Sequence, residues 1–211
     1  IEAFGKDKVL SLSFRYDQRH VNELLQAEKI CRDWGVEHVE LSIDCLQAIT
    51  RNALMDTTIP IHHEKQQPPN TLVTGRNGLM VRLAAIHADH LGAHCVYTGI
   101  LALEEANSGY RDCSRAYMDL MEKILRLDFD NDRFEIRTPL VFMTKKETME
   151  LGKKLGILAY LLENTVSCYE GVQGLGCEQC PACVLRNQGI AEFLKDHPDF
   201  VMPYEFANFV R

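Results

Sequence analysis

The chain has 211 residues, of which 46% are hydrophobic, and carries a formal net charge of −7 at pH 7. Its length predicts one packed domain, or one domain with a small appendage. With no apolar run of about 18 residues and no signal-peptide pattern at the N-terminus, we expect a soluble cytoplasmic protein without membrane contact. The acidic charge, without a basic face, argues against direct nucleic-acid binding and favours small polar ligands.

The first 98 residues alternate apolar strand patterns with amphipathic helix patterns. Gly35 and Gly92 follow the two helical stretches, as is usual just beyond the last turn of a helix. In chain order we expect a strand at 8–14, a helix at 21–34, a strand at 36–43, a helix at 77–91 and a strand at 94–98.

The alternation continues through the second half of the chain. Thr144 and Glu147 have the spacing of a capping box and open a helix that Gly156 closes. The other expected elements are a helix at 112–127, a strand at 134–137 and a final helix at 184–194. Such a succession predicts an α/β fold with a doubly wound parallel sheet.

The segment 55–70 interrupts this pattern with three prolines and little periodicity, and we expect a long loop there. Loops of this kind at the carboxyl ends of parallel strands often cover a ligand. His62, His63 and Glu64 lie in it, but adjacent histidines in a proline-rich loop are usually solvated, so we assign no metal site to them.

Four of the eight cysteines follow the pattern C-x8-C-x2-C-x2-C near the C-terminus. Two-residue gaps bring thiolates together around a tetrahedral zinc ion, and a loop with three glycines can return the fourth ligand. Four protein thiolates leave no open position for water, so such a zinc ion would be structural. The alternatives are a disulfide pair or unrelated buried thiols. The four candidate ligands are Cys168, Cys177, Cys180 and Cys183.

The remaining cysteines and the C-terminal tail carry weaker signals. Cys31, Cys45, Cys95 and Cys113 are scattered through regular segments and are best interpreted as reduced small hydrophobic residues. The tail, residues 202–211, contains several apolar side chains that pack either on a neighbouring subunit or back on the domain.

Three short segments, at 16–20, 69–77 and 108–113, together with the cysteine cluster give the chain a recognisable order of motifs. In this order they resemble the QueC family, the ATP-dependent 7-cyano-7-deazaguanine synthases of the adenine nucleotide α-hydrolase, or PP-loop, fold. The resemblance covers essentially the whole chain. It implies a Rossmann-like nucleotide-binding domain at 1–160 and a zinc-binding element at 161–211.

The resemblance also implies a reaction and its cofactors. Family members convert 7-carboxy-7-deazaguanine and ammonia into the nitrile, through an adenylated carboxylate and then an amide. We therefore expect ATP, Mg²⁺ and a structural Zn²⁺ as cofactors, a deazaguanine as the substrate, and a homodimer. No catalytic residue is assigned.

By the same resemblance, a set of residues is expected to bind the nucleotide or the substrate, with Arg76 as the main phosphate contact at a helix N-terminus. Structural alternatives are that Arg19 only forms a surface ion pair, that Asp112 only caps its helix and that Gly75 only turns the chain. The expected binding residues are Gln18, Arg19, His20, Gly75, Arg76, Asn77, Thr98, Gly99, Ser108, Gly109, Tyr110 and Asp112.

The sequence also departs from the family pattern. The phosphate loop Ser-Gly-Gly-x-Asp-Ser does not occur in it, and we expect the first strand and this loop to be missing through an incomplete N-terminus. Arg15 and Asp17 stand where the family has an acidic residue and a glycine, and Arg111 replaces a proline. These changes leave two further interpretations open: an enzyme that joins the activated deazaguanine to another amine, such as a protein N-terminus in antiviral defence, or an inactive zinc-stabilised binding protein.

Overall fold

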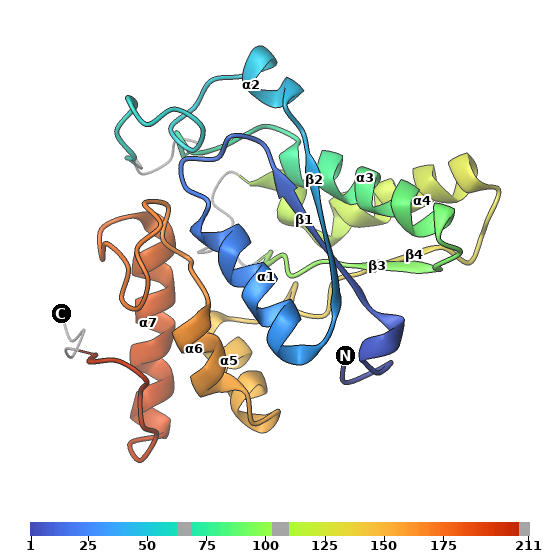
Figure 1. Cartoon of the computed structure of the whole chain (residues 1–211). Coiled ribbons are helices and arrows are strands. Elements are labelled where there is room, and N and C mark those ends of the chain that lie inside the picture. The colour runs from blue at the N-terminus through green and yellow to red at the C-terminus, as the bar shows by residue number, and fades with distance from the viewer. Residues whose placement is uncertain (63–68, 103–109, 207–211) are drawn as a thin grey trace. The chain divides into compact units, whose positions relative to one another are not determined.

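A computed structural model describes residues 1–62, 69–102 and 110–206. The chain forms two compact units, one of Ile1–His63 with Lys145–Arg211 and one of Glu64–Thr144. Figure 1 follows the elements along the chain. None of the helices in these described ranges combines the length and the hydropathy needed to cross a bilayer.

The first unit begins with a strand, helix, strand unit. Gly35 ends the helix in the left-handed conformation, with φ of 64°, which glycine adopts without steric cost. The two strands are parallel, with Leu10 opposite Glu37 and Arg15 opposite Ser42, as a helical crossover requires. Its elements are η1 Lys6–Lys8, β1 Leu10–Arg15, α1 Asn22–Trp34, β2 Glu37–Ser42 and α2 Cys45–Ile49.

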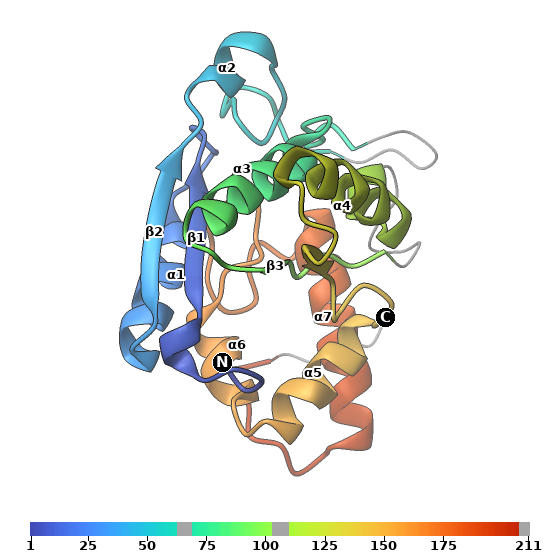
Figure 2. The ribbon, with the colours of Figure 1, turned by 90° about the vertical axis from the view of Figure 1, so that its right-hand side faces the viewer.

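Three helices from the end of the chain complete the first unit, and they lie together in Figure 2. Their shared core contains Met149, Leu158, Ile190 and Phe193, all at most 6% exposed. Gly189 lets α5 and α7 approach closely, because a Cβ there would lie 2.4 Å from the Cβ of Lys145. The helices are α5 Lys145–Lys154, α6 Leu158–Asn164 and α7 Pro181–Asp196.

The described part of the C-terminal tail packs back on this helical core. Phe200, Met202 and Phe206 are partly buried against it. Of the two possibilities that the sequence left open for this segment, packing on its own unit is the one observed for residues 202–206. The rest of the tail, 207–211, lies outside the described residues.

The second unit is smaller and also contains one parallel pair of strands. Cys95 lies opposite Glu135, and Tyr97 opposite Arg137. Ser114 is the N-cap of α4, and its hydroxyl accepts a hydrogen bond from the backbone N–H of Tyr117. The elements are α3 Arg76–His90, β3 Cys95–Tyr97, η2 Arg111–Cys113, α4 Arg115–Phe129 and β4 Glu135–Arg137.

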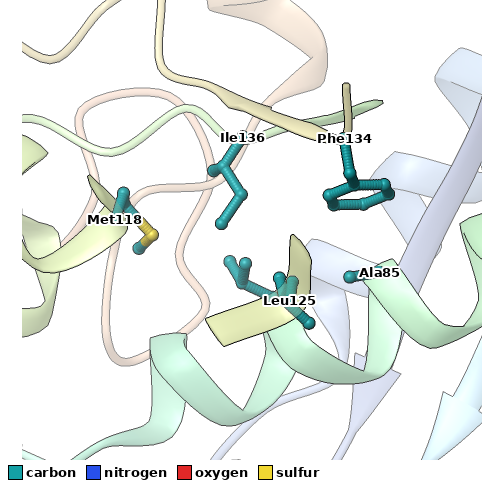
Figure 3. Packing of buried hydrophobic residues seen from close by; sticks show 6 residues of the cluster. Ala85, Met118, Leu125, Phe134 and Ile136 are labelled. Carbon is teal, nitrogen blue, oxygen red and sulfur yellow. The ribbon is translucent and has the colours of Figure 1, made fainter. Parts of the chain in front are cut away.

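The core of the second unit lies between α3, α4 and β4 (Figure 3). Burying side chains of this kind is the main contribution to stability, at about 25 cal/mol per Å² of apolar surface. Gly78 on α3 makes room for the packing, because a Cβ there would overlap the hydroxyl of Tyr117 on α4. The buried residues are Val81, Ala85, Met118, Leu125, Phe134 and Ile136.

The expected α/β composition with parallel strands is confirmed, and each element predicted from the sequence falls within a few residues of an observed one. The expected doubly wound sheet is not confirmed, because the strands of the described residues form two separate two-stranded sheets. Two short helices, α2 and α6, were not expected. The division at residue 160 into a nucleotide-binding domain and a zinc-binding element stays a prediction.

Candidate metal centre and ligand-binding residues

The four clustered cysteines lie on the loop between α6 and α7 and on the first turn of α7. Pro181 at the first position of α7 has the fixed φ that starts a helix, and it follows Cys180 directly. Gly176 adopts φ of 71° and passes so close to the cluster that a Cβ there would lie 2.3 Å from the Sγ of Cys183. Only glycine can occupy this position without displacing a ligand.

The four Sγ atoms all lie within 4.8 Å of one another. Those of Cys177 and Cys183 are 4.0 Å apart. With metal–sulfur bonds of about 2.3 Å, a tetrahedral site places its sulfurs about 3.8 Å apart. The predicted set of four cysteines is therefore brought together by the fold, and its spacing fits a tetrahedral metal ion.

Backbone amides support the sulfurs as they do in thiolate sites. The N–H of Glu170 donates to the Sγ of Cys168, and the N–H of Cys180 donates to the Sγ of Cys177, each at 3.3 Å. Burial opposes ionisation of Cys177, but the N–H groups of Cys180 and Gln179 outweigh it and lower the pKa of Cys177 to about 7. Burial and the neighbouring thiols of Cys180 and Cys168 raise the pKa of Cys183. Without a cation, four thiolates could not ionise together here.

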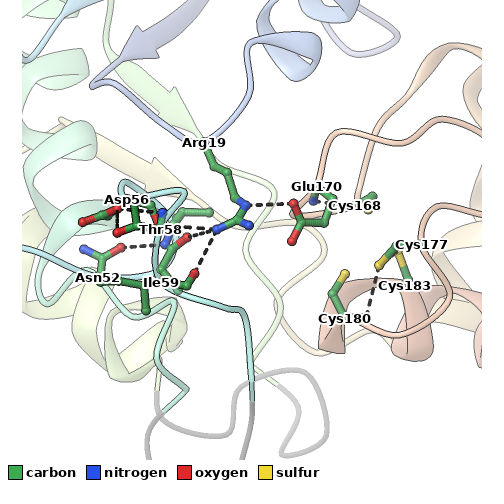
Figure 4. Close-up of polar contacts among 12 residues, drawn as sticks. Arg19, Asn52, Asp56, Thr58, Ile59, Cys168, Glu170, Cys177, Cys180 and Cys183 are labelled. Atoms are coloured by element: carbon green, nitrogen blue, oxygen red, sulfur yellow. Dashed lines mark hydrogen bonds and ion pairs between the residues drawn. The ribbon is translucent and has the colours of Figure 1, made fainter.

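Arg19, one of the expected binding residues, connects two loops beside the cysteines (Figure 4). Its Nε donates to Glu170 Oε2 at 2.8 Å, and its Nη1 donates to the carbonyl oxygens of Ala53, Asp56 and Ile59 at 3.0–3.4 Å. This is more than the surface ion pair considered as an alternative, because the side chain is only 13% exposed. Arg19 therefore holds the 53–59 loop against the 165–180 loop between α6 and α7, which we call the cysteine loop.

Gln18 and His20 flank Arg19 and are positioned by the same region. The Oε1 of Gln18 accepts a hydrogen bond from the N–H of Tyr16 at 3.0 Å. His20 packs against Gly171 of the cysteine loop, where an added Cβ would lie 2.7 Å from the ring. Of the predicted residues 18–20, Arg19 and His20 thus contact the loop that carries the cysteines, at Glu170 and Gly171, whereas Gln18 contacts the strand before it.

Asp17 occupies the place of a glycine in the family pattern. Its φ is 55°, which is the left-handed conformation that glycine adopts freely and that aspartate also tolerates. The backbone turn is thus kept, while an exposed carboxylate is added beside Gln18 and Arg19.

A second group of expected residues meets in the other unit, around the N-terminus of α3. The N–H of Asn77 donates to the carboxylate of Asp112 at 3.0 Å, and the Nδ2 of Asn77 lies 3.1 Å from the Sγ of Cys113. Gly75 is the N-cap of α3 with φ of 75°. Asp112 therefore caps α3. The structural alternative, that it caps the helix that follows it in the sequence, is not what the structure shows.

The other expected residues of this unit are less closely grouped. The hydroxyls of Tyr110 and Thr71 lie 2.7 Å apart, and the Nη2 of Arg76 donates to Oδ1 of Asn77 at 3.3 Å. Thr98 and Gly99 follow the last residue of β3. Ser108 and Gly109, as well as His63 and Glu64, lie outside the described residues.

One buried and one partly buried cation were not expected from the sequence. Arg186 on α7 is 7% exposed, and the partly buried Lys145 at the start of α5 lies beside α7 at Gly189. Burial, with the positive charge of Arg186, lowers the pKa of Lys145. Within the described ranges, neither side chain forms an ion pair with a carboxylate.

The guanidinium of Arg186 is held in place by its neighbour Asn187. Its Nε and Nη2 donate to Oδ1 of Asn187 at 3.2 and 3.1 Å, and the Nδ2 of Asn187 donates to the carbonyl of Leu175 at 3.1 Å. The available signal in the sequence was a pair of polar residues three and four positions after Cys183, on the same side of the final helix as this cysteine. A buried positive charge without an acid beside it is suited to binding an anion.

These features define an α/β protein with a candidate four-cysteine metal centre and, beside it, the buried Arg186 with the partly buried Lys145. The family model for "Queuosine biosynthesis protein QueC" matches residues 3–194 of the chain. The chain therefore belongs to the QueC family. Membership implies an ATP-using enzyme of the synthase type that acts on a small molecule in queuosine biosynthesis.

Proposed function

We propose that this protein converts 7-carboxy-7-deazaguanine and ammonia into 7-cyano-7-deazaguanine at the expense of ATP. The observation that carries the proposal is the family match over residues 3–194, together with the convergence of the four cysteines that end the family's pattern. In this reaction the substrate carboxylate attacks the α-phosphorus of ATP and releases pyrophosphate. Ammonia then displaces AMP to form an amide.

The nitrile arises when the amide oxygen is activated in the same way and leaves with AMP as the amide nitrogen loses its protons. Each activation converts one ATP, with Mg²⁺, to AMP and pyrophosphate. A carboxylate or an amide oxygen is a poor leaving group until it is adenylated. A site for this chemistry must therefore hold several anionic groups at once.

The ion at the cysteine cluster is Zn²⁺ in this proposal. Four sulfur ligands at tetrahedral spacing favour zinc, and they leave no position for water or substrate. The zinc ion fixes the loop before α7 to the start of that helix. The loop in turn contacts Arg19 and His20, so the metal stabilises the expected binding residues without entering the chemistry.

Lys145 and Arg186 bind an oxyanion of the nucleotide or of the carboxylate substrate. The support is that Arg186 is buried and Lys145 partly buried, and that neither has an acidic partner within the described ranges, which is unfavourable in a protein whose site never holds an anion. Gln18, Arg19 and His20 contribute to the same unit's binding surface. Gly75, Arg76, Asn77, Thr98, Gly99, Ser108, Gly109, Tyr110 and Asp112 remain proposed contacts to the nucleotide or the substrate. The protein is proposed to act as a homodimer in the cytoplasm.

A second function is favoured by one observation. Asp17 keeps the backbone turn of the family's glycine but adds an exposed carboxylate next to the expected binding residues. A carboxylate there suits a cationic acceptor, so the activated deazaguanine would pass to another amine, such as a protein N-terminus, in place of ammonia.

The deciding experiment incubates the full-length protein with ATP, Mg²⁺, 7-carboxy-7-deazaguanine and an ammonium salt, and follows the products by mass spectrometry. We expect the nitrile, with AMP and pyrophosphate. AMP formation without amide or nitrile would favour the second function, which a peptide with a free N-terminus then tests. Absence of AMP under all these conditions would contradict both and support an inactive binding protein.

A further inference from the structure

The hydroxyl of Tyr204 is buried and has no hydrogen-bond partner among the described residues. Leaving a buried hydroxyl without a partner is destabilising, so folded proteins rarely keep one without a reason. Replacing this tyrosine by phenylalanine would remove the cost at no loss of packing. The presence of the hydroxyl therefore points to an acceptor that binds there.

The position of this side chain is set by its own segment. Met202 and Phe206 on either side are partly buried in the helical core of the first unit. The ring of Tyr204 packs against Gly174 of the cysteine loop, where a Cβ would lie 3.8 Å from Cγ of the ring. The segment is thus held by its apolar neighbours and the ring by the cysteine loop, and the hydroxyl oxygen is buried.

One positive charge, that of Arg186, acts on the hydroxyl of Tyr204. Burial raises the pKa of Tyr204, and the nearby Arg186 opposes this shift. The same guanidinium acts on Lys145. Arg186 and Tyr204 both lie against the 165–180 loop, with Nη2 of Arg186 at Gly176 and the ring of Tyr204 at Gly174. A protonated phenol near a guanidinium that has no acidic partner among the described residues offers hydrogen bonds to the same kind of ligand, an oxyanion.

We propose that Tyr204 is a third member of the anion site of Lys145 and Arg186 and donates its hydroxyl to a phosphate or carboxylate oxygen of the bound ligand. This inference rests on the anion-binding role assigned to those two cations in the proposed function. It adds a residue from the last described turn of the chain, which none of the family motifs at 16–20, 69–77 and 108–113 includes. Tyr204 is a ligand-binding residue in this site.

The test compares wild-type protein with Tyr204→Phe in direct binding measurements, with no turnover required. Three probes are titrated separately: inorganic pyrophosphate, AMP and 7-carboxy-7-deazaguanine. A hydrogen bond to a charged group is lost in the variant, so we expect affinity for at least one probe to fall about tenfold or more. The probe that is affected identifies whether the oxygen belongs to a phosphate or to the substrate carboxylate.

Two further variants make the outcome decisive. Tyr160→Phe removes a surface hydroxyl that donates to Asp33 in the same unit, and it should leave all three affinities unchanged. Lys145→Met should weaken the same probe as Tyr204→Phe. Equal affinities of wild type and Tyr204→Phe, with Lys145→Met impaired, would overturn the role of Tyr204 while the anion site stands.

Thermal unfolding without ligand separates this role from a structural one. Removing an unsatisfied hydroxyl should leave the melting temperature of Tyr204→Phe unchanged or raised, whereas a structural hydrogen bond would lower it. Failure of the proposed reaction leaves the inference intact if pyrophosphate or AMP still binds in a Tyr204-dependent way. If none of the probes binds even the wild-type protein, the inference is wrong.

Discussion

Arg19 and Glu170 are 151 positions apart in the sequence, yet Nε of Arg19 donates to Oε2 of Glu170 at 2.8 Å. Glu170 is also tied to the cysteine cluster, because its backbone N–H donates to the Sγ of Cys168. The same guanidinium holds the carbonyls of Ala53, Asp56 and Ile59. The cysteine loop and the 53–59 loop are therefore joined through the side chain of Arg19 (Figure 4).

We expect Glu170→Ala to loosen the 53–59 loop while the metal stays bound. Arg19 would lose its only acidic partner in the described structure and keep its carbonyl contacts, for a loss of about 1 kcal/mol in the free energy of unfolding. Hydrogen exchange at residues 53–59 should become faster. Glu163→Ala, which removes an exposed carboxylate from α6, is the matched control and should change neither. Unchanged exchange at this loop in Glu170→Ala would argue against the connection.

The four-cysteine site should determine the stability of the first unit. Cys183→Ser removes a buried ligand, and we expect the bound metal to fall from one ion per chain to near zero, with a loss of at least about 3 kcal/mol in the free energy of unfolding. Elemental analysis and thermal unfolding measure the two effects. Cys45→Ser changes an exposed cysteine outside the cluster and should alter neither. Equal metal contents in the two variants would rule out the site.

Gly176 offers a test of local geometry. Alanine there is strained by its φ of 71°, and its Cβ would lie 2.3 Å from the Sγ of Cys183. Gly156 has the same φ, but an added Cβ meets no atom of the described residues within 4 Å. Gly156→Ala should therefore cost about 1 kcal/mol through backbone strain alone, while Gly176→Ala should also weaken metal binding. If a competition assay with a chelator gives both variants the wild-type metal affinity, the close approach has no consequence.

The sequence predicted the metal centre well because its information is local. Cys177, Cys180 and Cys183 are separated by two residues each, and their spacing alone determines that they face one point. Helix α1 was equally predictable, since an apolar face and Gly35 define it without tertiary context. Helix α2 was missed because five residues with a single buried side chain, Leu46, show no periodicity.

The pairings of distant residues could not be read from the sequence. That Lys145 lies beside Arg186 depends on the packing of α5 on α7 at Gly189, which no pattern within either helix specifies. Likewise, the family motif predicted the importance of Asp112 but not its contact with Asn77. Such contacts arise from tertiary packing and become visible only in the folded unit.

The carboxylate of Asp112 should stabilise α3. It accepts from the N–H of Asn77, one of the amides that an N-terminus leaves without an intrahelical partner, and its charge is favourable there. We expect Asp112→Ala to lower the free energy of unfolding by about 1–2 kcal/mol, and Asp112→Asn by less because an acceptor oxygen remains. Chemical denaturation measures both. A binding role for Asp112 requires Asp112→Asn to lose ligand affinity beyond what this small loss of stability explains.

Lys145→Met should separate stability from function. Burial lowers the pKa of Lys145, so its charged form is less favoured in the folded protein than in the unfolded chain. Between the lowered pKa and the unfolded value near 10.5, the unfolded chain binds the proton and the folded chain does not. Stability contributed by this group therefore rises with pH through that window.

Methionine fills the same space without charge, so we expect the ligand-free Lys145→Met variant to unfold at a higher temperature at neutral pH and to lose this part of the rise. Pyrophosphate, which stabilises the wild type against thermal unfolding in the proposed site, should no longer stabilise the variant. A less stable Lys145→Met that still responds to pyrophosphate would mean that Lys145 serves the fold and not an anion.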